Sequence, residues 1–341
     1  MENAVYAECS EEERRSLIRK YIVLSSEYSG DFFRDEYGVL DKDYVKALMN
    51  HICRVLAKQG MQLTDKDMME LLQDAEKNNY AIPHFNHSDF WDMSAIAEAA
   101  QEKDTPVFIA CLPKVIEAIG IEKLGAVAQI TMEQSKTPII YHLDHCHSVE
   151  LCLKAIDNGY NSVMIDAADL PLEENIKAVK TVVDYAHARN VHVEAEIGKI
   201  KSAGDEGYTP EAAFAGIEEA KQLVDETGVD ALAVSIGSEH GFYQHAPKLD
   251  YDLLEKIHAH VQVPLVLHGG SGIPEDDVRK AINGGIRKVN VGTHIRYTYV
   301  KSVGEAIQEK GPATHTADIM EVAKKNVKEV LYDWMRICSN K

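Results

Sequence analysis

Eight short runs of β-branched and other apolar residues recur along the chain, and each is followed by a segment with a helical pattern. The apolar runs are Ala81–Asn86, Pro106–Ala110, Pro138–Asp144, Ser162–Asp166, His192–Ile197, Ala231–Ile236, Pro264–His268 and Arg287–Val291. The helical segments between them include Trp91–Lys103, Ser148–Asn158, Leu172–Ala188, Pro210–Glu226 and Pro274–Asn283. Strands that alternate with helices predict a parallel sheet with crossover helices. Eight such units favour closure into a (β/α)8 TIM barrel over an open doubly wound sheet.

The beginning of the chain has a different pattern. It carries two helical patterns, the second over Asp41–Lys58, and no convincing strand. Thr64 then predicts the cap of a helix that leads into the first strand. We therefore predict a helical extension over residues 1–62, followed by the barrel domain over residues 63–341. The last helix of that domain, about Ala317–Cys338, lies beyond the eighth unit.

The chain is strongly acidic, with a net charge of −19 and a sequence pI near 5.2. Such a charge repels nucleic acids and anionic membranes, so we expect neither as a partner. A phosphorylated substrate would be repelled as well. A site for one must therefore supply its own local donors and cations.

The sequence shows no targeting or membrane segment. No apolar run reaches 18 residues, and the acidic start Met1–Glu13 lacks the apolar core of a signal peptide. The six cysteines form no C-x-x-C pair, which favours free thiols in a reducing compartment. We expect a cytoplasmic protein.

Polar residues recur at the carboxyl ends of the predicted strands, where barrel enzymes place their active sites. Strand alternation puts His142 and Asp144 on one face of the third strand. On the fifth strand it puts Glu194 and Glu196 on the face opposite Val193, which predicts that both carboxylates point into the barrel. Carboxylates in such a place are costly unless they are paired or lie near a metal.

Three histidines at strand ends, His145, His240 and His268, are the candidate metal ligands. Three imidazoles and one open position are typical of catalytic zinc. Other histidines remain competitors for the same role. They are His142, His147 and His245.

Glycine-rich turns follow the last two predicted strands. Gly269–Gly272 follows the seventh, and the segment Asn290–Thr293 spans the end of the eighth. Barrel enzymes often bind phosphate with these two loops, through backbone N–H groups and a helix N-terminus. The sequence therefore predicts a phosphate site at this part of the rim.

At these residues the sequence resembles the class II fructose-1,6-bisphosphate and tagatose-1,6-bisphosphate aldolases, over about residues 64–338. The matching stretches, in chain order, are AIPHFN, YHLDHCHS, NSVMIDAADLPLEENI, YAHARNVHVEAEIG, GVDALAVSIGSEHGFY, PKLDYDLL, VPLVLHGGSGIP and KVNVGT. The resemblance implies a zinc-dependent aldolase that forms or breaks a carbon–carbon bond in a phosphorylated ketose. Zinc would polarise the ketone oxygen as a Lewis acid.

The resemblance also implies roles for individual residues. The zinc ligands would be His145, His240 and His268, with Glu196 binding the metal in an alternative position. Asp144 would move the proton of the C4 hydroxyl, and Asn290 would hold the enediolate. An acidic loop, Gly198–Tyr208, would supply the base for the carbon acid, for which we choose Glu206 with Asp205 as the alternative.

Further residues are implied to bind the substrate. The phosphate of the dihydroxyacetone phosphate half would meet Gly241, Gly269, Ser271 and Thr293, and a monovalent cation, Na⁺ or K⁺, often assists there. Arg296 would meet an anionic group at the aldehyde end. Asn86, at the end of the first strand, is a further candidate for substrate binding.

Several positions depart from the family pattern. They are Leu112, Ala167, Ala168, Asp169, Lys201, Ser202, Gln244, Gly292 and His294. The positions that would contact the ketone half of the substrate match the family. The departures therefore leave the identity of the sugar open, whereas the reaction type is unaffected. We expect that dihydroxyacetone phosphate is one product and that fructose-1,6-bisphosphate is not the best ketose.

The sequence therefore predicts reversible aldol cleavage of fructose-1,6-bisphosphate, tagatose-1,6-bisphosphate or a related ketose 1-phosphate, by a homodimer or homotetramer. Three other functions remain open. The first is a Schiff-base aldolase, although Lys288, the nearest inward lysine, lies deep in the barrel. The others are a zinc hydrolase and a catalytically altered barrel that acts as a sugar-phosphate-binding or structural subunit.

Overall fold

The computed structural model describes residues 33–35, 38–40, 68–200, 214–242 and 247–341. The chain divides into two compact units, Met1–Asp65 and Lys66–Lys341. In the first unit, β1 (Phe33–Asp35) and β2 (Gly38–Leu40) pair antiparallel, with Phe33 opposite Leu40. The expectation of no strand in this region was wrong, because strands of three residues are too short to show a two-residue alternation. The helices predicted there lie outside the described residues.

The second unit contains a closed barrel of eight parallel strands, as predicted from the eight apolar runs. The strands are β3 (Ile82–Asn86), β4 (Val107–Cys111), β5 (Ile139–Cys146), β6 (Ser162–Ile165), β7 (His192–Ile197), β8 (Ala231–Val234), β9 (Leu265–Leu267) and β10 (Ile286–Val291). Each pairs with its neighbour in chain order, and β10 pairs with β3 to close the barrel. In the closing pair, Asn290 lies opposite His84.

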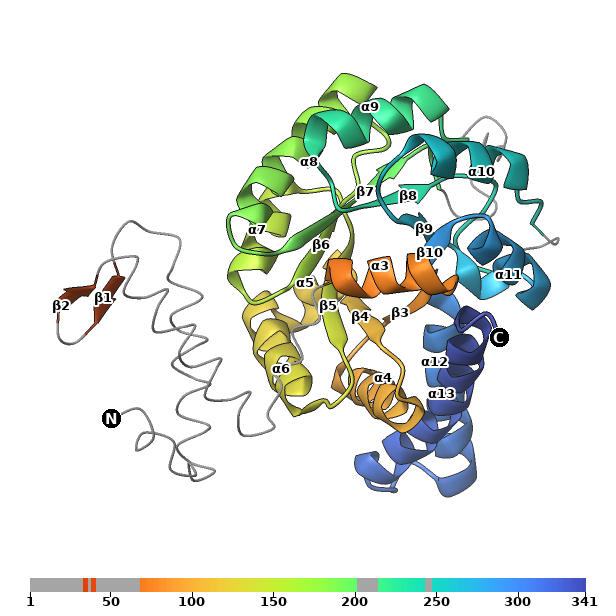
Figure 1. Ribbon diagram of the computed structural model, residues 1–341. Helices are drawn as coiled ribbons and strands as arrows, with labels where there is room; N and C mark the ends of the chain where they lie inside the picture. The colour runs from red at the N-terminus through yellow and green to blue at the C-terminus, as the bar shows by residue number, and fades with distance from the viewer. Residues whose placement is uncertain (1–32, 36–37, 41–67, 201–213, 243–246) are drawn as a thin grey trace, which may run out of the picture. The chain divides into compact units, whose positions relative to one another are not determined.

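Helices surround the strands (Figure 1). They are α4 (Phe90–Lys103), α5 (Pro113–Ile119), α6 (Ile121–Gln134), α7 (Val149–Asp157), α8 (Leu172–His187), α9 (Ile217–Thr227), α10 (Tyr251–His260), α11 (Glu275–Asn283), α12 (Thr293–Lys310) and α13 (Thr316–Cys338), with a short 3-10 turn, η2 (Gly270–Gly272). The last helix, α13, packs against α12 and α4. Its carbonyl at Cys338 accepts a hydrogen bond from the Ala81 amide (2.9 Å), which ties the end of the chain to the start of β3.

Side-chain caps fix where several of these helices begin. Asp89 accepts hydrogen bonds from the first turn of α4, and Asp92 bonds back to the Asp89 amide, which completes a capping box. Ser148 caps α7 by accepting a hydrogen bond from the Leu151 amide, and Asp250 caps α10 by accepting one from the Leu253 amide. These short polar side chains satisfy amide groups that would otherwise lack a partner. Each cap therefore fixes the residue at which the helix begins.

A further helix, α3 (Met68–Asn78), closes one end of the barrel. Met68, Leu71 and Leu72 on its buried face form a hydrophobic cluster with inward-facing residues of the barrel strands, among them Phe108 and Val266. Figure 1 shows α3 lying across the strands at this end. A separate and larger cluster fills the layer between the strands and the outer helices. Because the strands are parallel and α3 precedes β3, the carboxyl ends of the strands lie at the opposite end.

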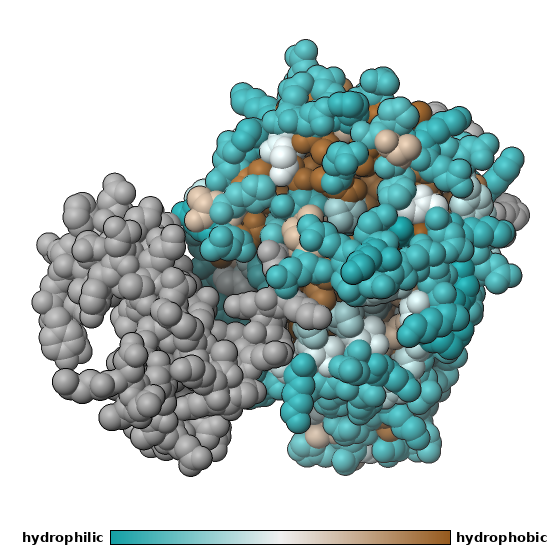
Figure 2. Space-filling view, viewed as in Figure 1, coloured by the Kyte–Doolittle hydropathy of each residue, from teal (hydrophilic) through white to brown (hydrophobic). Residues whose placement is uncertain are grey.

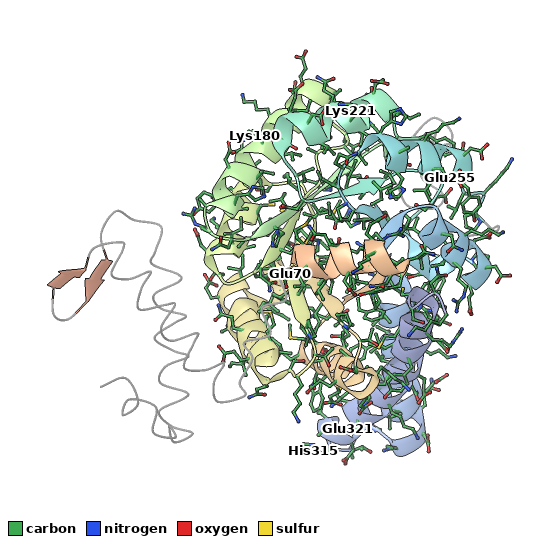
Figure 3. The ribbon with its side chains drawn as sticks, viewed as in Figure 1. Glu70, Lys180, Lys221, Glu255, His315 and Glu321 are labelled. Atoms are coloured by element: carbon green, nitrogen blue, oxygen red, sulfur yellow. The ribbon has the colours of Figure 1, made fainter. Side chains whose placement is uncertain are left out.

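The face of this unit drawn in Figure 2 is mostly hydrophilic, with apolar residues visible between the hydrophilic ones. Lys180 on α8, Lys221 on α9 and Glu321 on α13 point outward from the barrel (Figure 3). Among the described residues, no helix combines the length and the apolar character that crossing a bilayer requires. The cysteines of the described part are free and buried, and they are Cys111, Cys146, Cys152 and Cys338.

Candidate active site

A cavity of about 520 Å³ lies at the carboxyl ends of the barrel strands. Every site residue predicted from the sequence within the described part of the chain lines this cavity. These residues are Asn86, Asp144, His145, Glu196, His240, Gly241, His268, Gly269, Ser271, Asn290, Thr293 and Arg296. The predicted loop base Glu206 and its alternative Asp205 lie outside the described residues.

The three histidines predicted as metal ligands converge in this cavity. The ring of His145 lies 4.6 Å from the ring of His240 and 4.6 Å from that of His268, measured between centroids. One nitrogen atom of each ring lies within 4.8 Å of the others. The three side chains come from segments far apart in the sequence, so the barrel assembles the group.

Carboxylates orient two of these rings. Nδ1 of His145 lies 3.1 Å from Asp166 Oδ2, and Nε2 of His268 lies 2.9 Å from Glu194 Oε1. The opposite nitrogens of the two rings then face each other, 2.8 Å apart. Metal-binding histidines usually donate their second nitrogen to a carboxylate or carbonyl, which fixes the ring and its tautomer. The donor set therefore fits a zinc ion held by three imidazoles.

The backbone at His145 contributes to this arrangement. Its φ angle is 46°, in the left-handed region that non-glycine residues seldom adopt. The pairing of β5 with β6 also shifts register between Leu143 and Cys146. Backbone strain of this kind costs roughly 1–3 kcal/mol and persists where the surrounding structure holds it. Here the strained residue is His145, whose ring lies beside the rings of His240 and His268.

The charges around the histidines favour a cation. Burial alone would lower the pKa of His145, but the Asp144, Asp166 and Glu196 carboxylates outweigh it and raise this pKa to about 10. Burial, followed by the nearby Asp166 charge, holds the pKa of Glu196 well above its usual range. Oε1 of Glu196 accepts a hydrogen bond from the Ile200 amide (3.2 Å), whereas its buried Oε2 has no hydrogen-bond partner. An unpartnered carboxylate oxygen that can share a metal with His145 fits a ligand in an alternative position.

Asp144 is held by amide donors from two other strands. Its Oδ2 accepts a hydrogen bond from Asn86 Nδ2 (2.7 Å), and its Oδ1 accepts one from Asn290 Nδ2 (3.3 Å). His84 Nε2 lies 3.5 Å from Oδ2 without a hydrogen bond. Burial would raise the pKa of Asp144, but its interactions with His145 and His84 outweigh this and hold the pKa well below its usual range. These interactions therefore favour the ionised form of Asp144.

A buried ion pair lies beneath these groups. Lys288 Nζ donates to Glu194 Oε2 (2.7 Å) and to Asn290 Oδ1 (2.9 Å), and neither charged side chain is exposed. The lysine orients the Asn290 amide so that its Nδ2 points toward Asp144. Because Lys288 is held by Glu194, it is not a free amine of the kind that forms a Schiff base.

The two glycine-rich turns meet on one side of the cavity. Gly269 has a φ of 72° and precedes η2, and Ser271 Oγ accepts a hydrogen bond from the His294 amide (3.1 Å) in the first turn of α12. Thr293 is the first residue of α12, and Arg296 follows one turn later. A helix N-terminus beside a glycine turn offers the unpaired amides and the positive dipole end that favour an anion.

A sequence profile described as fructose-bisphosphate aldolase class-II matches residues 66–341. The chain belongs to this family. The family match supports an aldolase, a carbon–carbon lyase, as the general activity. It begins where the second structural unit begins, so this aldolase barrel accounts for the whole match.

Solved structures of aldolases are similar to this one. The YdjI aldolase from Escherichia coli K12 is 30% identical, with a TM-score of 0.70 over 80% of this chain and 96% of that chain. A putative fructose-1,6-biphosphate aldolase from Coccidioides immitis is 28% identical, with a TM-score of 0.73 over 81% of this chain and 97% of that one. The fructose-bisphosphate aldolase of Campylobacter jejuni, at 18% identity, a TM-score of 0.66 and coverages of 79% and 93%, shares the fold.

The competing histidines occupy different places in this aldolase. His142 is fully buried below the cavity, where its Nδ1 lies 2.7 Å from Ser162 Oγ. It could form a second group of ligand atoms with His84 and Asp144. His147 lines the cavity, but its Nδ1 lies 2.8 Å from the Asp166 carbonyl oxygen, to which it can donate. His245 lies outside the described residues.

Four of the positions that depart from the family pattern line the aldolase cavity. These four are Leu112, Ala168, Asp169 and Gly292. A Cβ atom at position 292 would come within 2.7 Å of Asn86 Oδ1, so glycine leaves room for this side chain. Ala167 is buried. His294 accepts a hydrogen bond from Trp334 Nε1 (3.2 Å). The remaining departures, Lys201, Ser202 and Gln244, lie outside the described residues.

Sequence reasoning missed several residues that organise the site. Asp166 was read only as a strand end, although it orients His145. Lys199 and Asp169 both line the cavity and form an ion pair (3.2 Å) across two loops. Strand alternation signalled that Glu194 points inward but could not identify Lys288, on a distant strand, as its partner.

Proposed function

We propose that this aldolase catalyses the reversible, zinc-dependent cleavage of a ketose 1-phosphate to dihydroxyacetone phosphate and an aldehyde. The convergence of the three histidine rings beside Asp144 and Asn290 is the observation that carries the proposal. One bound zinc would supply Lewis-acid polarisation of the ketone oxygen. The donor set supports this metal because it consists of imidazoles whose far nitrogens meet carboxylates.

The residues around the ketose would divide the remaining work. Asp144 accepts the proton of the C4 hydroxyl as the C3–C4 bond breaks and the aldehyde carbonyl forms. The electron pair of the broken bond is delocalised to the ketone oxygen, and the Asn290 amide donates a hydrogen bond at this end of the substrate. Protonation of C3 completes the reaction, and Glu206 is our choice for this acid.

The glycine-rich turns would bind the phosphate of the dihydroxyacetone phosphate half. Gly241 supports this, because it has a φ of 102° and, among the described residues, no atom lies within 4 Å of its Cβ position. The positive end of α12 and the hydroxyls of Ser271 and Thr293 add donors. These local donors would offset the repulsion that the acidic chain exerts on a phosphate.

Ser271→Ala together with Thr293→Val is expected to raise the KM for dihydroxyacetone phosphate by about 10-fold or more, because two hydrogen bonds to a charged ligand are lost. Zinc content should not change, since neither residue is one of the three histidines proposed to hold the metal. Initial rates of aldol condensation and metal analysis check both statements. An unchanged KM in the double variant would place the phosphate elsewhere in the cavity.

The family assignment does not identify the aldehyde that is released from the substrate. A panel of aldehydes condensed with dihydroxyacetone phosphate would identify the preferred product. We expect that fructose-1,6-bisphosphate is not the best ketose, because Leu112, Ala168 and Asp169 depart from the family pattern and line the cavity. Arg296 supports a substrate with an anionic far end, since a guanidinium suits bidentate binding of phosphate or carboxylate.

Arg296→Ala is expected to raise the KM for an anionic-ended ketose by about 10-fold or more, and to change it little for a neutral-ended analogue. The comparison of the two substrates in one variant separates loss of an anion contact from general damage. An equal change in KM for the two substrates would show that Arg296 does not bind the anionic group. Faster cleavage of fructose-1,6-bisphosphate than of every other ketose would show that the departures do not alter selectivity.

A further inference from the structure

Two buried histidines lie below the cavity, and neither takes part in the proposed reaction. His84 on β3 and His142 on β5 are both fully buried, and their rings meet edge to face with centroids 5.3 Å apart. His84 also stacks on the Phe108 ring (6.2 Å). Among the described residues, both nitrogens of His84 and Nε2 of His142 have no hydrogen-bond partner. Buried polar atoms without a partner are costly, so these nitrogens indicate a ligand.

The hydrogen bonds around His142 fix which of its two nitrogens carries the proton. Nδ1 lies 2.7 Å from Ser162 Oγ, and the Ser162 hydroxyl donates to Met68 Sδ (3.3 Å). Because the hydroxyl proton is used in this way, Oγ accepts from the Nδ1–H group of His142. Nε2 is therefore unprotonated. A neutral imidazole whose second nitrogen is held by a hydrogen bond is the usual form of a metal-binding histidine.

The Asp144 carboxylate completes a group of three possible ligands. One ligand atom each of His84, His142 and Asp144 lies within 4.8 Å of the other two. His84 Nε2 and Asp144 Oδ2 are 3.5 Å apart. Two ligands of one tetrahedral ion, each about 2.0–2.2 Å from it, lie roughly 3.4 Å from each other. The separation of the two atoms therefore already suits a shared ion.

We propose that His84, His142 and Asp144 bind a second divalent transition-metal ion, such as zinc, in addition to the ion of the three converging histidines. Two imidazoles and one carboxylate suit zinc, cobalt or nickel, whereas magnesium and calcium prefer oxygen ligands. The ion would enter from the cavity, because Asp144 lines it and the two imidazoles lie behind this carboxylate.

The charges around this group make it the weaker of the two sites. Lys288 Nζ lies 5.0 Å from the centroid of the Phe108 ring on which His84 stacks. Glu194 neutralises this lysine (2.7 Å), so Asp144 supplies the net negative charge for an incoming cation. A zinc ion already bound at the three converging histidines would repel a second cation. We therefore expect the two ions to bind in order, the second only at higher free zinc.

A second ion at this place would inhibit the aldolase. This consequence rests on the proposed function, in which Asp144 accepts the proton of the C4 hydroxyl. A carboxylate that binds a cation is a weaker base, because the cation stabilises its ionised form. The second ion would therefore slow carbon–carbon bond cleavage without displacing the first.

The first experiment measures the zinc bound per chain by equilibrium dialysis and elemental analysis. We expect a second equivalent to bind at about 10-fold higher free zinc than the first, or more, because of the repulsion between the ions. His84→Phe keeps an aromatic ring beside Phe108 and should retain the first equivalent but lose the second. His147→Ala is the matched control, since it removes an imidazole of the cavity outside this group, and it should keep both. A wild type that never binds a second equivalent, or a second equivalent that survives His84→Phe, would overturn the proposal.

Wild-type crystals soaked in excess zinc test the position of the ion without any variant. Anomalous difference maps from data on either side of the zinc absorption edge should show a peak between the two imidazoles and Asp144. A second zinc peak found only at another place would count against this site.

Initial rates of cleavage at the same free-zinc concentrations test the inhibition. The wild-type rate should rise with the first equivalent and fall by about 10-fold or more as the second binds, since proton transfer to Asp144 is then impaired. His84→Phe, compared with its own rate at one equivalent, should not fall. A second ion that binds without slowing the reaction would refute the inhibition and the proton transfer assigned to Asp144. Absence of a second ion would refute the site and leave the proposed function intact.

Discussion

Asp144→Asn is expected to lower kcat by about 10²-fold or more, the usual contribution of a general acid or base. The asparagine keeps the size of the side chain, and its Oδ1 can still accept from Asn86 or Asn290. It cannot accept the proton of a hydroxyl. Steady-state rates in the cleavage direction, together with metal analysis, measure the effect. Zinc content should stay that of the wild type, because Asp144 is next to a ligand but is not one of the three histidines.

A control in the same cavity separates this effect from a general change of charge. Asp169 also lines the cavity but forms its ion pair with Lys199, away from the histidines. Asp169→Asn should therefore change kcat far less than Asp144→Asn. Near-normal turnover in the Asp144 variant would assign the proton transfer to another group, of which Glu206 is the first candidate.

Removal of the metal is expected to abolish activity, with about one zinc per chain in the purified protein. Without a Lewis acid at the ketone oxygen, the charge that develops there has the Asn290 amide as its only donor among the residues assigned to the reaction. Exhaustive chelation followed by stepwise addition of zinc should remove activity and then restore it. Elemental analysis at each step relates activity to metal content.

Two histidine variants sharpen this test. His240→Ala should lose most of the bound zinc, because it removes one of the three converging rings. His147→Ala removes a ring from the same cavity, but one whose Nδ1 lies against the Asp166 carbonyl oxygen, and should keep the zinc. Full activity with no detectable metal would exclude the proposed mechanism.

The barrel could be predicted because its strands are buried on both sides. Such strands appear as nearly continuous apolar runs, and eight runs with helices between them leave few alternatives. The bounds of the first barrel strand were predicted to within one residue, since Ala81–Asn86 was expected and Ile82–Asn86 is observed. Strand alternation also predicted that Glu194 and Glu196 point inward, and both are buried. The local sequence pattern therefore predicted both the fold and the side chains that point into the barrel.

The partners of these residues could not be predicted, because they depend on which strands meet across the barrel. Lys288 and Glu194 are 94 residues apart in the chain and 2.7 Å apart in space. The pattern of α3 likewise showed a helix before the first strand but not what its apolar face would cover. Its contacts with Phe108 and Val266 arise only when the barrel closes beneath it.

The two amides that hold Asp144 come from the first and last strands of the barrel, β3 and β10, which pair with each other to close it. A chain that has folded seven strands but not the eighth therefore lacks one of the donors on its proton-accepting carboxylate, as well as the Thr293 end of α12. A chain in which β10 is not paired with β3 would thus be inactive toward a sugar phosphate. Recovery of turnover during refolding would follow the joining of the two ends of the sheet, the strand pairing with the greatest separation along the chain in this barrel, and such distant pairings slow folding.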